Sequence, residues 1–255
     1  MNTNQAFTIL ENSGDIRAAR IIVSKFPKIS RLRTIYYAHL LRRGVPVAKI
    51  IHSKWFYGIE FFTNTHTLDP RPDTETLVES VIHDCTTTNP RNILDMGTGT
   101  GCIICAICKN IPDINGTAID ISRSALRVAR KNIKKLNLNK RIKTKHASFA
   151  NFKSDEKFDI IVSNPPYIKY GDSRVNNAAK FDPRIALYAK NDGLMAYEQI
   201  AQNAKKLLKS DGKIYLEIGV GQSAPVIKIF EFYKWKFERV EKDLSGINRV
   251  LVFTT

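Results

Sequence analysis

The sequence predicts an α/β protein: a mostly parallel sheet with helices on both faces, preceded by a small helical region and a β-hairpin. From Arg91 onward, short β-branched segments alternate with helical ones, which is typical of parallel sheets. A glycine-rich turn follows the first of these segments. Before Arg91, apolar residues first recur at helical spacing and then form an aromatic run around Gly58.

The N-terminal segment, residues 1–43, is predicted to be helical. Its apolar residues recur every three or four positions, and Gly14 and Pro27 interrupt the pattern. We expect three parts in the chain: a helical domain, a hairpin linker and a sheet domain, over residues 1–47, 48–69 and 70–255.

The sheet domain is predicted to begin with a helix inside "DPRPDTETLVESVI". Pro70 and Pro72 hold the approach to this helix in an extended conformation. Asp73 is expected to cap the helix, and Glu75 places negative charge in its first turn, where the helix dipole favours it.

The rest of the domain is predicted to alternate between strands and helices. The expected strands cover residues 92–96, 114–120, 141–147, 158–163, 212–218, 236–243 and 249–255. The expected helices cover residues 101–110, 122–136, 193–208 and 223–233. Ligands of such sheets bind beyond the carboxyl ends of the strands, so site residues are expected directly after them.

The formal charge of +16, from 40 basic and 24 acidic residues, favours anionic partners such as nucleic acid. No acidic residue occurs between positions 121 and 154. The part 123–145 of this stretch contains Arg123, Arg127, Arg130, Lys131, Lys134, Lys135, Lys140, Arg141, Lys143 and Lys145. A solvated helix face and a surface that contacts RNA or the ribosome explain the 123–145 stretch equally well.

Neither a membrane span nor a metal site is expected. No segment reaches the 18 or so apolar residues of a span, and the N-terminal residues lack the pattern of a signal peptide, so we expect a cytoplasmic protein. Cys102, Cys105 and Cys108 have a spacing known from iron–sulfur sites. They lie in an apolar helical segment, however, and we expect buried thiols there.

The turn "LDMGTGTG" follows the first strand of the sheet domain. Gly97, Gly99 and Gly101 permit a tight turn and a close approach of a ligand to the backbone. Asp120 ends the next strand, where a carboxylate can accept hydrogen bonds from two ribose hydroxyls. These features predict a nucleoside-containing cofactor, either a dinucleotide or S-adenosylmethionine. Because the turn starts at Asp95 and lacks G-x-G-x-x-G, it resembles that of Rossmann-like S-adenosylmethionine-dependent methyltransferases, whose sheets end with an antiparallel last strand.

The tetrapeptide Asn164-Pro165-Pro166-Tyr167 follows the fourth strand of the sheet domain. The two prolines have no backbone N–H, so the loop offers hydrogen-bond acceptors, the Asn164 side-chain oxygen and the Pro165 carbonyl. A planar –NH2 group, which has two protons to donate, is their natural partner, and Tyr167 could stack on it. Acceptors on both protons would orient the nitrogen for attack on a methyl group. The exocyclic amine of adenine and the side-chain amide of glutamine both fit this chemistry.

Seven segments that include these motifs follow one another along the chain. They are "PRPDTETLVE" (70–79), "LDMGTGTGCI" (94–103), "AIDIS" (118–122), "FDIIVSNPPYI" (158–168), "DPRIALYAKNDGLMAYEQI" (182–200), "YLEIG" (215–219) with Gln222, and "DLSGINRV" (243–250). The series resembles the release factor N5-glutamine methyltransferases, the PrmC/HemK family. The resemblance implies methyl transfer from S-adenosylmethionine, which leaves S-adenosylhomocysteine, to the glutamine of the Gly-Gly-Gln motif in a class I peptide chain release factor.

The resemblance also assigns roles to single residues. The implied cofactor-binding residues are Asp95, Gly97, Thr98, Gly99, Thr100, Gly101, Asp120, Phe149 and Asn164, with Phe149 beside the adenine. The tetrapeptide residues Asn164, Pro165, Pro166 and Tyr167 would hold the substrate glutamine, and Arg71 and Thr74 would shape the mouth of its site. The helical N-terminal domain would orient the substrate.

Four positions depart from the family's pattern, and two other functions compete with it. The departures are Val45, Asp69, Ser148 and Asp182. The main alternative is an adenine-N6 methyltransferase acting on DNA or RNA, which the basic charge favours, although little of the chain is left for a target-recognition region. A non-catalytic binding protein is the other, but the intact tetrapeptide and glycine turn weigh against it.

Overall fold

The structure, a computed structural model, describes residues 1–173 and 177–255. Helices α1 (Thr3–Glu11), α2 (Ile16–Lys25), α3 (Arg31–Arg42) and α4 (Val47–Ile51) form its first part. They enclose an apolar core of their own, which consists of Ala6, Leu10, Ala19, Ile22, Ile29, Ala38 and Ile50. Asp15 and Ser30 cap α2 and α3 by accepting backbone N–H groups of the first turn. The predicted helical segment is confirmed.

A β-hairpin, β1 (Ser53–Phe56) and β2 (Ile59–Phe62), follows α4. Tyr57 and Gly58 form its two-residue turn with φ values of 49° and 68°, the conformation that suits the twist of a hairpin. The expected domain boundary after residue 47 falls inside α4, which ends at Ile51. The predicted linker 48–69 therefore contains the rest of α4 as well as the hairpin. The division into domains stays a prediction.

The central sheet has the strand order β10-β11-β9-β6-β3-β4-β5. Its strands are β3 (Asn92–Met96), β4 (Asn115–Asp120), β5 (Ile142–His146), β6 (Phe158–Ser163), β9 (Leu208–Glu217), β10 (Lys236–Lys242) and β11 (Asn248–Thr254). Only β11 runs antiparallel to its neighbours, β9 and β10, which confirms the predicted sheet. The chain builds outward from β3 to β5 and then returns to the other side of β3, so the strand order reverses between β3 and β6.

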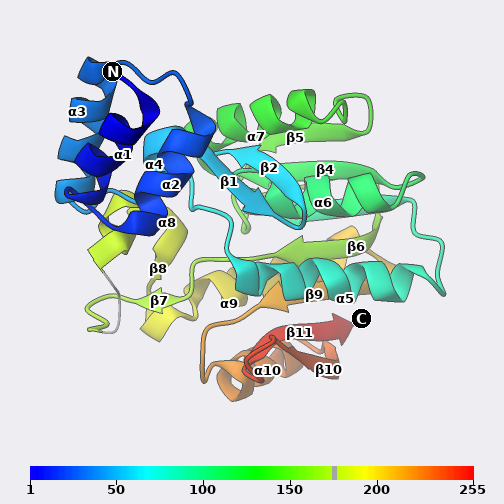
Figure 1. Ribbon diagram of the computed structural model, residues 1–255. Helices are drawn as coiled ribbons and strands as arrows, with labels where there is room; N and C mark the ends of the chain where they lie inside the picture. The colour runs from blue at the N-terminus through cyan, green and yellow to red at the C-terminus, as the bar shows by residue number, and fades with distance from the viewer. Residues whose placement is uncertain (174–176) are drawn as a thin grey trace.

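Helices cover both faces of the sheet (Figure 1). Helices α5 (Glu75–Cys85), α6 (Cys102–Asn110) and α7 (Arg123–Lys135) cover one face, and α9 (Met195–Ala204) and α10 (Ser223–Phe232) cover the other. Consecutive strand residues such as Ile93 and Leu94 belong to opposite cores, as the pleat of a strand requires. Cys102, Cys105 and Cys108 are buried on α6 as free thiols, which confirms their predicted place in the core.

The start of α5 differs from the prediction. A 3₁₀ turn, η1 (Pro72–Thr74), precedes the helix, and the Asp73 side chain makes no capping hydrogen bond. Its carboxylate instead lies 3.2 Å from Arg249 Nη2 on β11. Glu75 does lie in the first turn, where it accepts the backbone N–H of Tyr57 at 2.8 Å and so ties the hairpin to α5.

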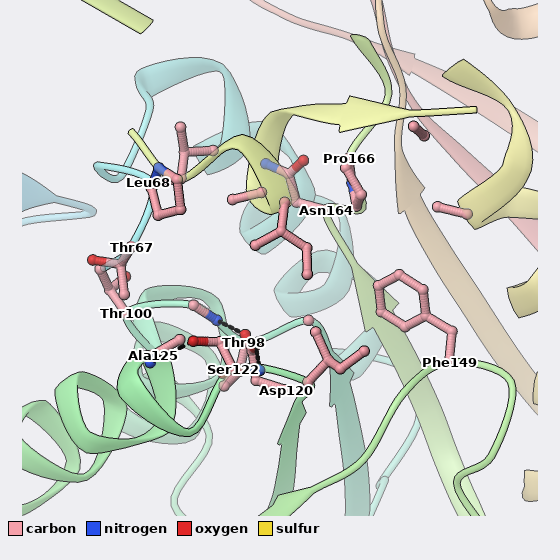
Figure 2. Close-up of a pocket in the computed structure, with 18 of the residues that line it drawn as sticks. Thr67, Leu68, Thr98, Thr100, Asp120, Ser122, Ala125, Phe149, Asn164 and Pro166 are labelled. Atoms are coloured by element: carbon pink, nitrogen blue, oxygen red, sulfur yellow. Dashed lines mark hydrogen bonds between the residues drawn. The ribbon is translucent and has the colours of Figure 1, made fainter. Parts of the chain in front are cut away.

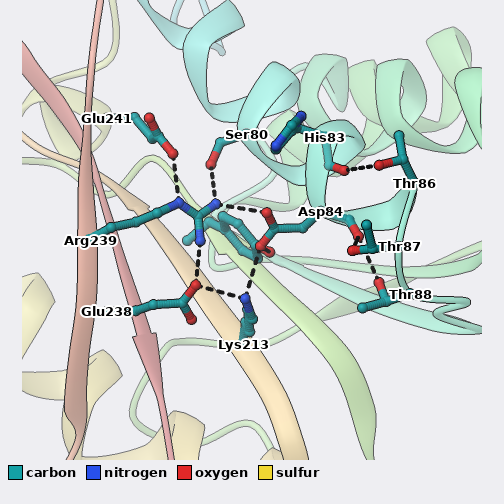
Figure 3. Close-up of polar contacts among 11 residues, drawn as sticks. Ser80, His83, Asp84, Thr86, Thr87, Thr88, Lys213, Glu238, Arg239 and Glu241 are labelled. Atoms are coloured by element: carbon teal, nitrogen blue, oxygen red, sulfur yellow. Dashed lines mark hydrogen bonds and ion pairs between the residues drawn. The ribbon is translucent and has the colours of Figure 1, made fainter.

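A polar cluster fastens the other end of α5 to the sheet (Figure 3). The Asp84 carboxylate accepts the Tyr215 hydroxyl at 2.6 Å, Lys213 Nζ at 3.1 Å and Arg239 Nη2 at 3.0 Å. The Arg239 guanidinium also donates to Ser80 Oγ at 3.1 Å. Three chain segments, α5, β9 and β10, are therefore joined by charge-assisted hydrogen bonds.

The segment after β6 contains several elements that the sequence did not predict. They are β7 (Ile168–Lys169), η2 (Asn177–Phe181), α8 (Arg184–Leu187), β8 (Tyr188–Ala189) and η3 (Asn191–Gly193). The predicted helix 193–208 is shorter, because α9 ends at Ala204, a 3₁₀ turn η4 (Lys205–Leu207) follows, and β9 begins at Leu208. In the described part of the chain, no helix is long and apolar enough to cross a membrane.

Candidate functional site

A cavity of about 390 Å³ opens at the carboxyl ends of β3, β4 and β6, where the strand order reverses (Figure 2). The predicted residues that line it are Gly97, Thr98, Gly99, Thr100, Asp120, Phe149, Asn164 and Pro166, together with Arg71, Thr74 and Ser148. The tetrapeptide begins 63 positions after Gly101, yet it borders the same space as the glycine turn. The cavity lies at the edge of the sheet where ligands of such folds are expected, and the assignment of the site residues stays a prediction.

The glycine turn bends tightly around the end of β3. Gly97, Gly99 and Gly101 have φ values of 81°, 54° and 78°, the left-handed region that glycine adopts without strain. The backbone N–H groups of Gly97 and Thr98 both donate to the Ile119 carbonyl at 2.9 Å, which holds the turn against β4. A Cβ atom at Gly99 would meet no described atom within 4 Å, so the backbone there borders open space.

Asp120 ends β4 with its carboxylate at the floor of the cavity (Figure 2). Its two oxygens accept the backbone N–H groups of Gly99 and Ser122, at 2.9 Å and 2.8 Å. Burial raises the pKa of Asp120, although these two hydrogen bonds oppose the rise. The carboxylate is therefore held rigidly, and each oxygen keeps a second lone pair for a ligand hydroxyl.

Phe149 forms a wall of the cavity next to Gly97. A Cβ atom at Gly97 would lie 3.1 Å from Cζ of the Phe149 ring, so the ring packs directly on the glycine backbone. Asn203 on α9 holds the segment by donating to the Phe149 carbonyl at 2.8 Å. Ser148, one of the departures from the family's pattern, lies beside Phe149 in the cavity lining.

Asn164 projects into the cavity from the end of β6 (Figure 2). Its Nδ2 donates to Thr74 Oγ1 at 3.1 Å. Because the two ends of a planar amide point in different directions, this bond turns Oδ1 away from Thr74. Oδ1 receives no hydrogen bond from the residues that the structure describes.

Four predicted site residues, Asp95, Gly101, Pro165 and Tyr167, do not line the cavity. Asp95 is fully buried beneath the turn, where its Oδ2 accepts the Thr98 hydroxyl at 2.6 Å. Burial raises the pKa of Asp95 to about 7. Pro165 is buried, and the Tyr167 hydroxyl donates to Glu217 Oε1 at 3.4 Å. The Tyr167 hydroxyl is thus directed toward the end of β9, and the stacking of its ring on a planar group stays a prediction.

Sequence reasoning gave no role to two residues that hold the tetrapeptide. Gln222 Nε2 donates to the Tyr167 carbonyl at 3.0 Å, and Gln222 Oε1 accepts the Gly219 N–H at 3.0 Å. A Cβ atom at Gly193 would lie 2.2 Å from the same Tyr167 carbonyl, so only glycine fits there. Gln222 was visible as part of a family segment, whereas the contact with Gly193 depends on the fold.

A cluster of charges lies at the mouth of the cavity, in which Lys49, Asp69 and Asp182 are buried and Arg71 is 44% exposed. Arg71 Nη2 donates to Asp182 Oδ2 at 2.8 Å. Lys49 Nζ lies 2.8 Å from Asp69 Oδ1 and 2.9 Å from Asp182 Oδ1. Two of the four departures from the family's pattern, Asp69 and Asp182, therefore meet at one lysine. Val45, a third departure, packs against the core of the N-terminal helices.

The chain is similar to known methyltransferases. A family profile described as "Methyltransferase small domain" matches residues 69–184. A release factor glutamine methyltransferase of Streptococcus pneumoniae (strain ATCC BAA-255 / R6) is 44% identical over 81% of this chain and 74% of its own. A bifunctional methyltransferase of Rickettsia prowazekii (strain Madrid E) is 37% identical over 97% of this chain and 52% of its own. The chain spans about half the length of such bifunctional relatives.

Among solved structures, the ribosomal protein L11 methylase of Lactobacillus delbrueckii subsp. bulgaricus is similar with a TM-score of 0.54. The match covers 74% of this chain and 81% of that chain at 19% identity, which shows a shared fold.

Proposed function

The chain belongs to the family of release factor glutamine methyltransferases, and on that premise we propose that it methylates the side-chain amide nitrogen (N5) of a glutamine. The proposed methyl donor is S-adenosylmethionine, and the proposed acceptor is the glutamine of the Gly-Gly-Gln motif in a class I peptide chain release factor. A release factor substrate would place the enzyme in the cytoplasm. In the reaction the bond between the methyl carbon and the sulfur breaks, a bond from this carbon to the amide nitrogen forms, and the nitrogen releases one of its two protons to water, which leaves S-adenosylhomocysteine.

The chain's residues fit a nucleoside-containing methyl donor. The backbone at Gly99 borders open space, and Asp120 is held with free lone pairs at the floor of the cavity. We assign the turn 97–101 to the methionine part, Asp120 to the ribose hydroxyls and Phe149 to the adenine. Asp95 supports the turn through Thr98 without touching the ligand. When bound, S-adenosylmethionine supplies an electrophilic methyl group on a positively charged sulfur.

The orientation of Asn164 is the observation that carries the proposal. Thr74 Oγ1 accepts a hydrogen bond from Asn164 Nδ2, and Asn164 lines the cavity, so we infer that its Oδ1 is available to a substrate. A primary amide of a substrate donates two N–H bonds, and an acceptor on one of them fixes the direction of the nitrogen lone pair. Preorganised positioning of this kind speeds transfer without any general base.

The test is methyl transfer from labelled S-adenosylmethionine to three candidates: a class I release factor, the same factor with its Gly-Gly-Gln glutamine changed, and unmethylated DNA. We expect label only in the intact factor. Asn164→Ala should then lower kcat roughly 10²-fold, the usual effect of removing one preorganised polar group. Label in DNA and none in the factor would overturn the proposal in favour of adenine-N6 methylation.

We also propose that the 123–145 stretch contacts RNA or the ribosome. All of its cations except Arg141 are exposed on α7, β5 and the turn between them. Arg141 donates to carbonyls of Ile111 and Pro112 and is structural. The strand β5 lies at an edge of the sheet, where exposed lysines also prevent pairing with the strand of another protein. This second explanation requires no RNA, so RNA binding has to be tested directly.

The double variant Lys134→Glu with Lys143→Glu should bind RNA more weakly, and its binding should depend less on salt. RNA binding equal to that of the unchanged chain would contradict the proposal.

A further inference from the structure

Glu217 is the buried acid at the site that the proposed function leaves without a role. It is the last residue of β9 and is 1% exposed. Its Oε1 contacts the Tyr167 hydroxyl at 3.4 Å, whereas its Oε2 has no hydrogen-bond partner in the described part of the chain. A buried carboxylate oxygen without a partner is unfavourable, so its retention calls for an explanation.

Several polar and charged groups face this carboxylate. Thr74 and Asp73 approach from η1, Tyr167 from the tetrapeptide and Arg249 from β11, while the Tyr197 hydroxyl of α9 donates to the Glu217 backbone carbonyl at 2.9 Å. The Arg249 guanidinium is directed to Asp243 at 2.9 Å and to Asp73 at 3.2 Å, so its charge is shared. Burial raises the pKa of Glu217 to about 7, while Thr74, Arg249 and Tyr167 oppose the rise.

The Thr74 hydroxyl lies between Glu217 and Asn164. Its oxygen accepts Nδ2 of Asn164 at 3.1 Å, so its single proton must be donated elsewhere. The Glu217 carboxylate is close enough for the Thr74 hydroxyl to lower the pKa of Glu217 against the rise that burial causes. An ionised carboxylate only accepts hydrogen bonds, and here it also has an oxygen without a partner.

We propose that Glu217 is a positioning residue that sets the orientation of the Asn164 amide through Thr74. The ionised carboxylate accepts the Thr74 proton, and Thr74 must then accept from Asn164, which directs Oδ1 to the cavity. The proposal rests on the proposed function, because it is the substrate's –NH2 group that requires an acceptor at this place.

The reverse arrangement follows when Glu217 can donate. A protonated Glu217, or a glutamine in its place, donates to Thr74, and Thr74 then donates its own proton to Asn164 Oδ1. The Asn164 amide turns over and presents its –NH2 end to the cavity. Two –NH2 groups facing each other have no acceptor between them, so the substrate nitrogen is no longer held.

The first experiment measures kcat and KM for the release factor across the neutral pH range. In the unchanged chain, kcat should fall toward acid pH as Glu217 is protonated. Glu217→Gln should lower kcat roughly 10²-fold and remove this acid limb, with little change in KM for the factor. Thr74→Val should act like Glu217→Gln, whereas Thr74→Ser keeps a hydroxyl and should restore activity and the acid limb. Wild-type kcat with an unchanged acid limb in Glu217→Gln would overturn the proposal.

Two further measurements separate this proposal from its premises. Asp84→Asn removes a different carboxylate, far from the site, and should leave the acid limb in place. Side-chain amide NMR of Asn164, assigned against Asn164→Ala, should show both N–H signals titrating near neutral pH in the unchanged chain but not in Thr74→Val. This NMR experiment requires no release factor, so it tests the role of Glu217 even if the proposed substrate is wrong. Amide signals that do not respond to pH would contradict the role of Glu217 directly.

Discussion

Lys49 on α4 and Asp182 before α8 form a buried ion pair with 2.9 Å between Nζ and Oδ1. The Lys49 side chain is 1% exposed and that of Asp182 is 3% exposed. Asp69 and Arg71 complete the cluster, which therefore contains two positive and two negative charges. The cluster connects the N-terminal helices to Pro183 and Ile185, residues that line the cavity.

Replacing Lys49 by methionine should destabilise the protein strongly. The variant leaves the Asp69 and Asp182 carboxylates buried, with Arg71 still paired to Asp182 and Thr63 still donating to Asp69 at 2.6 Å. Breaking a buried pair in this way costs about 3–5 kcal/mol. Adding Asp69→Leu, which restores the apolar residue expected before Pro70, should recover part of the loss. Urea unfolding measures both changes, with exposed Lys28→Met as the control. A free energy of unfolding equal for Lys49→Met and Lys28→Met would contradict this account.

The sheet and the place of the site followed from sequence patterns, but this cluster did not. Strand and helix periodicity is local, and the Gly97–Gly101 turn and Asn164 each follow a strand, so their meeting at one edge could be predicted. From the sequence, Lys49 would be predicted to be an ordinary surface lysine, because no nearby residue indicates that Asp69 and Asp182 pair with it. The side-chain direction of Tyr167 depends on Glu217, which lies 50 residues further along the chain.

Asn132 should prove essential for joining the hairpin to the glycine turn. This fully buried side chain accepts the Phe62 N–H at 2.8 Å and donates at 2.9 Å to both the Phe62 and Thr100 carbonyls. Asn132→Ala leaves these groups unpaired and should lower the free energy of unfolding by about 3 kcal/mol. Because Thr100 lies in the turn, binding of S-adenosylhomocysteine should weaken as well. Calorimetry measures both, and exposed Asn139→Ala should change neither.

Gly97→Ala should weaken binding of the methyl donor or its product. The glycine has a φ of 81°, where another residue is strained by about 1–2 kcal/mol, and its new Cβ would lie 3.1 Å from the Phe149 ring. We expect at least about a tenfold rise in Kd for S-adenosylhomocysteine, which corresponds to roughly 1.4 kcal/mol. Gly44→Ala separates backbone strain from the clash with Phe149. Gly44 has a φ of 76°, so the variant has the strain, but no described atom lies within 4 Å of the new Cβ. An unchanged Kd in Gly97→Ala would remove Phe149 from the adenine site.

Asp84→Asn should reduce stability in a way that depends on pH. Burial acts to raise the pKa of Asp84, but Tyr215, Lys213 and Arg239 outweigh it and hold the pKa below its ordinary value. A depressed carboxyl pKa contributes stability above the unfolded-state pKa, about 3.9, and loses it as the pH falls through the folded-state pKa. The variant should therefore be less stable by about 3 kcal/mol at neutral pH, and the difference should shrink below about pH 4. Urea unfolding at a series of pH values measures this, with Asp113→Asn as the control, because the Asp113 side chain is 72% exposed and 3.8 Å from Arg91. If the difference in the free energy of unfolding stays constant down to acid pH, the charge of Asp84 contributes nothing to stability. The side chain would then act only by filling the space between α5 and the sheet.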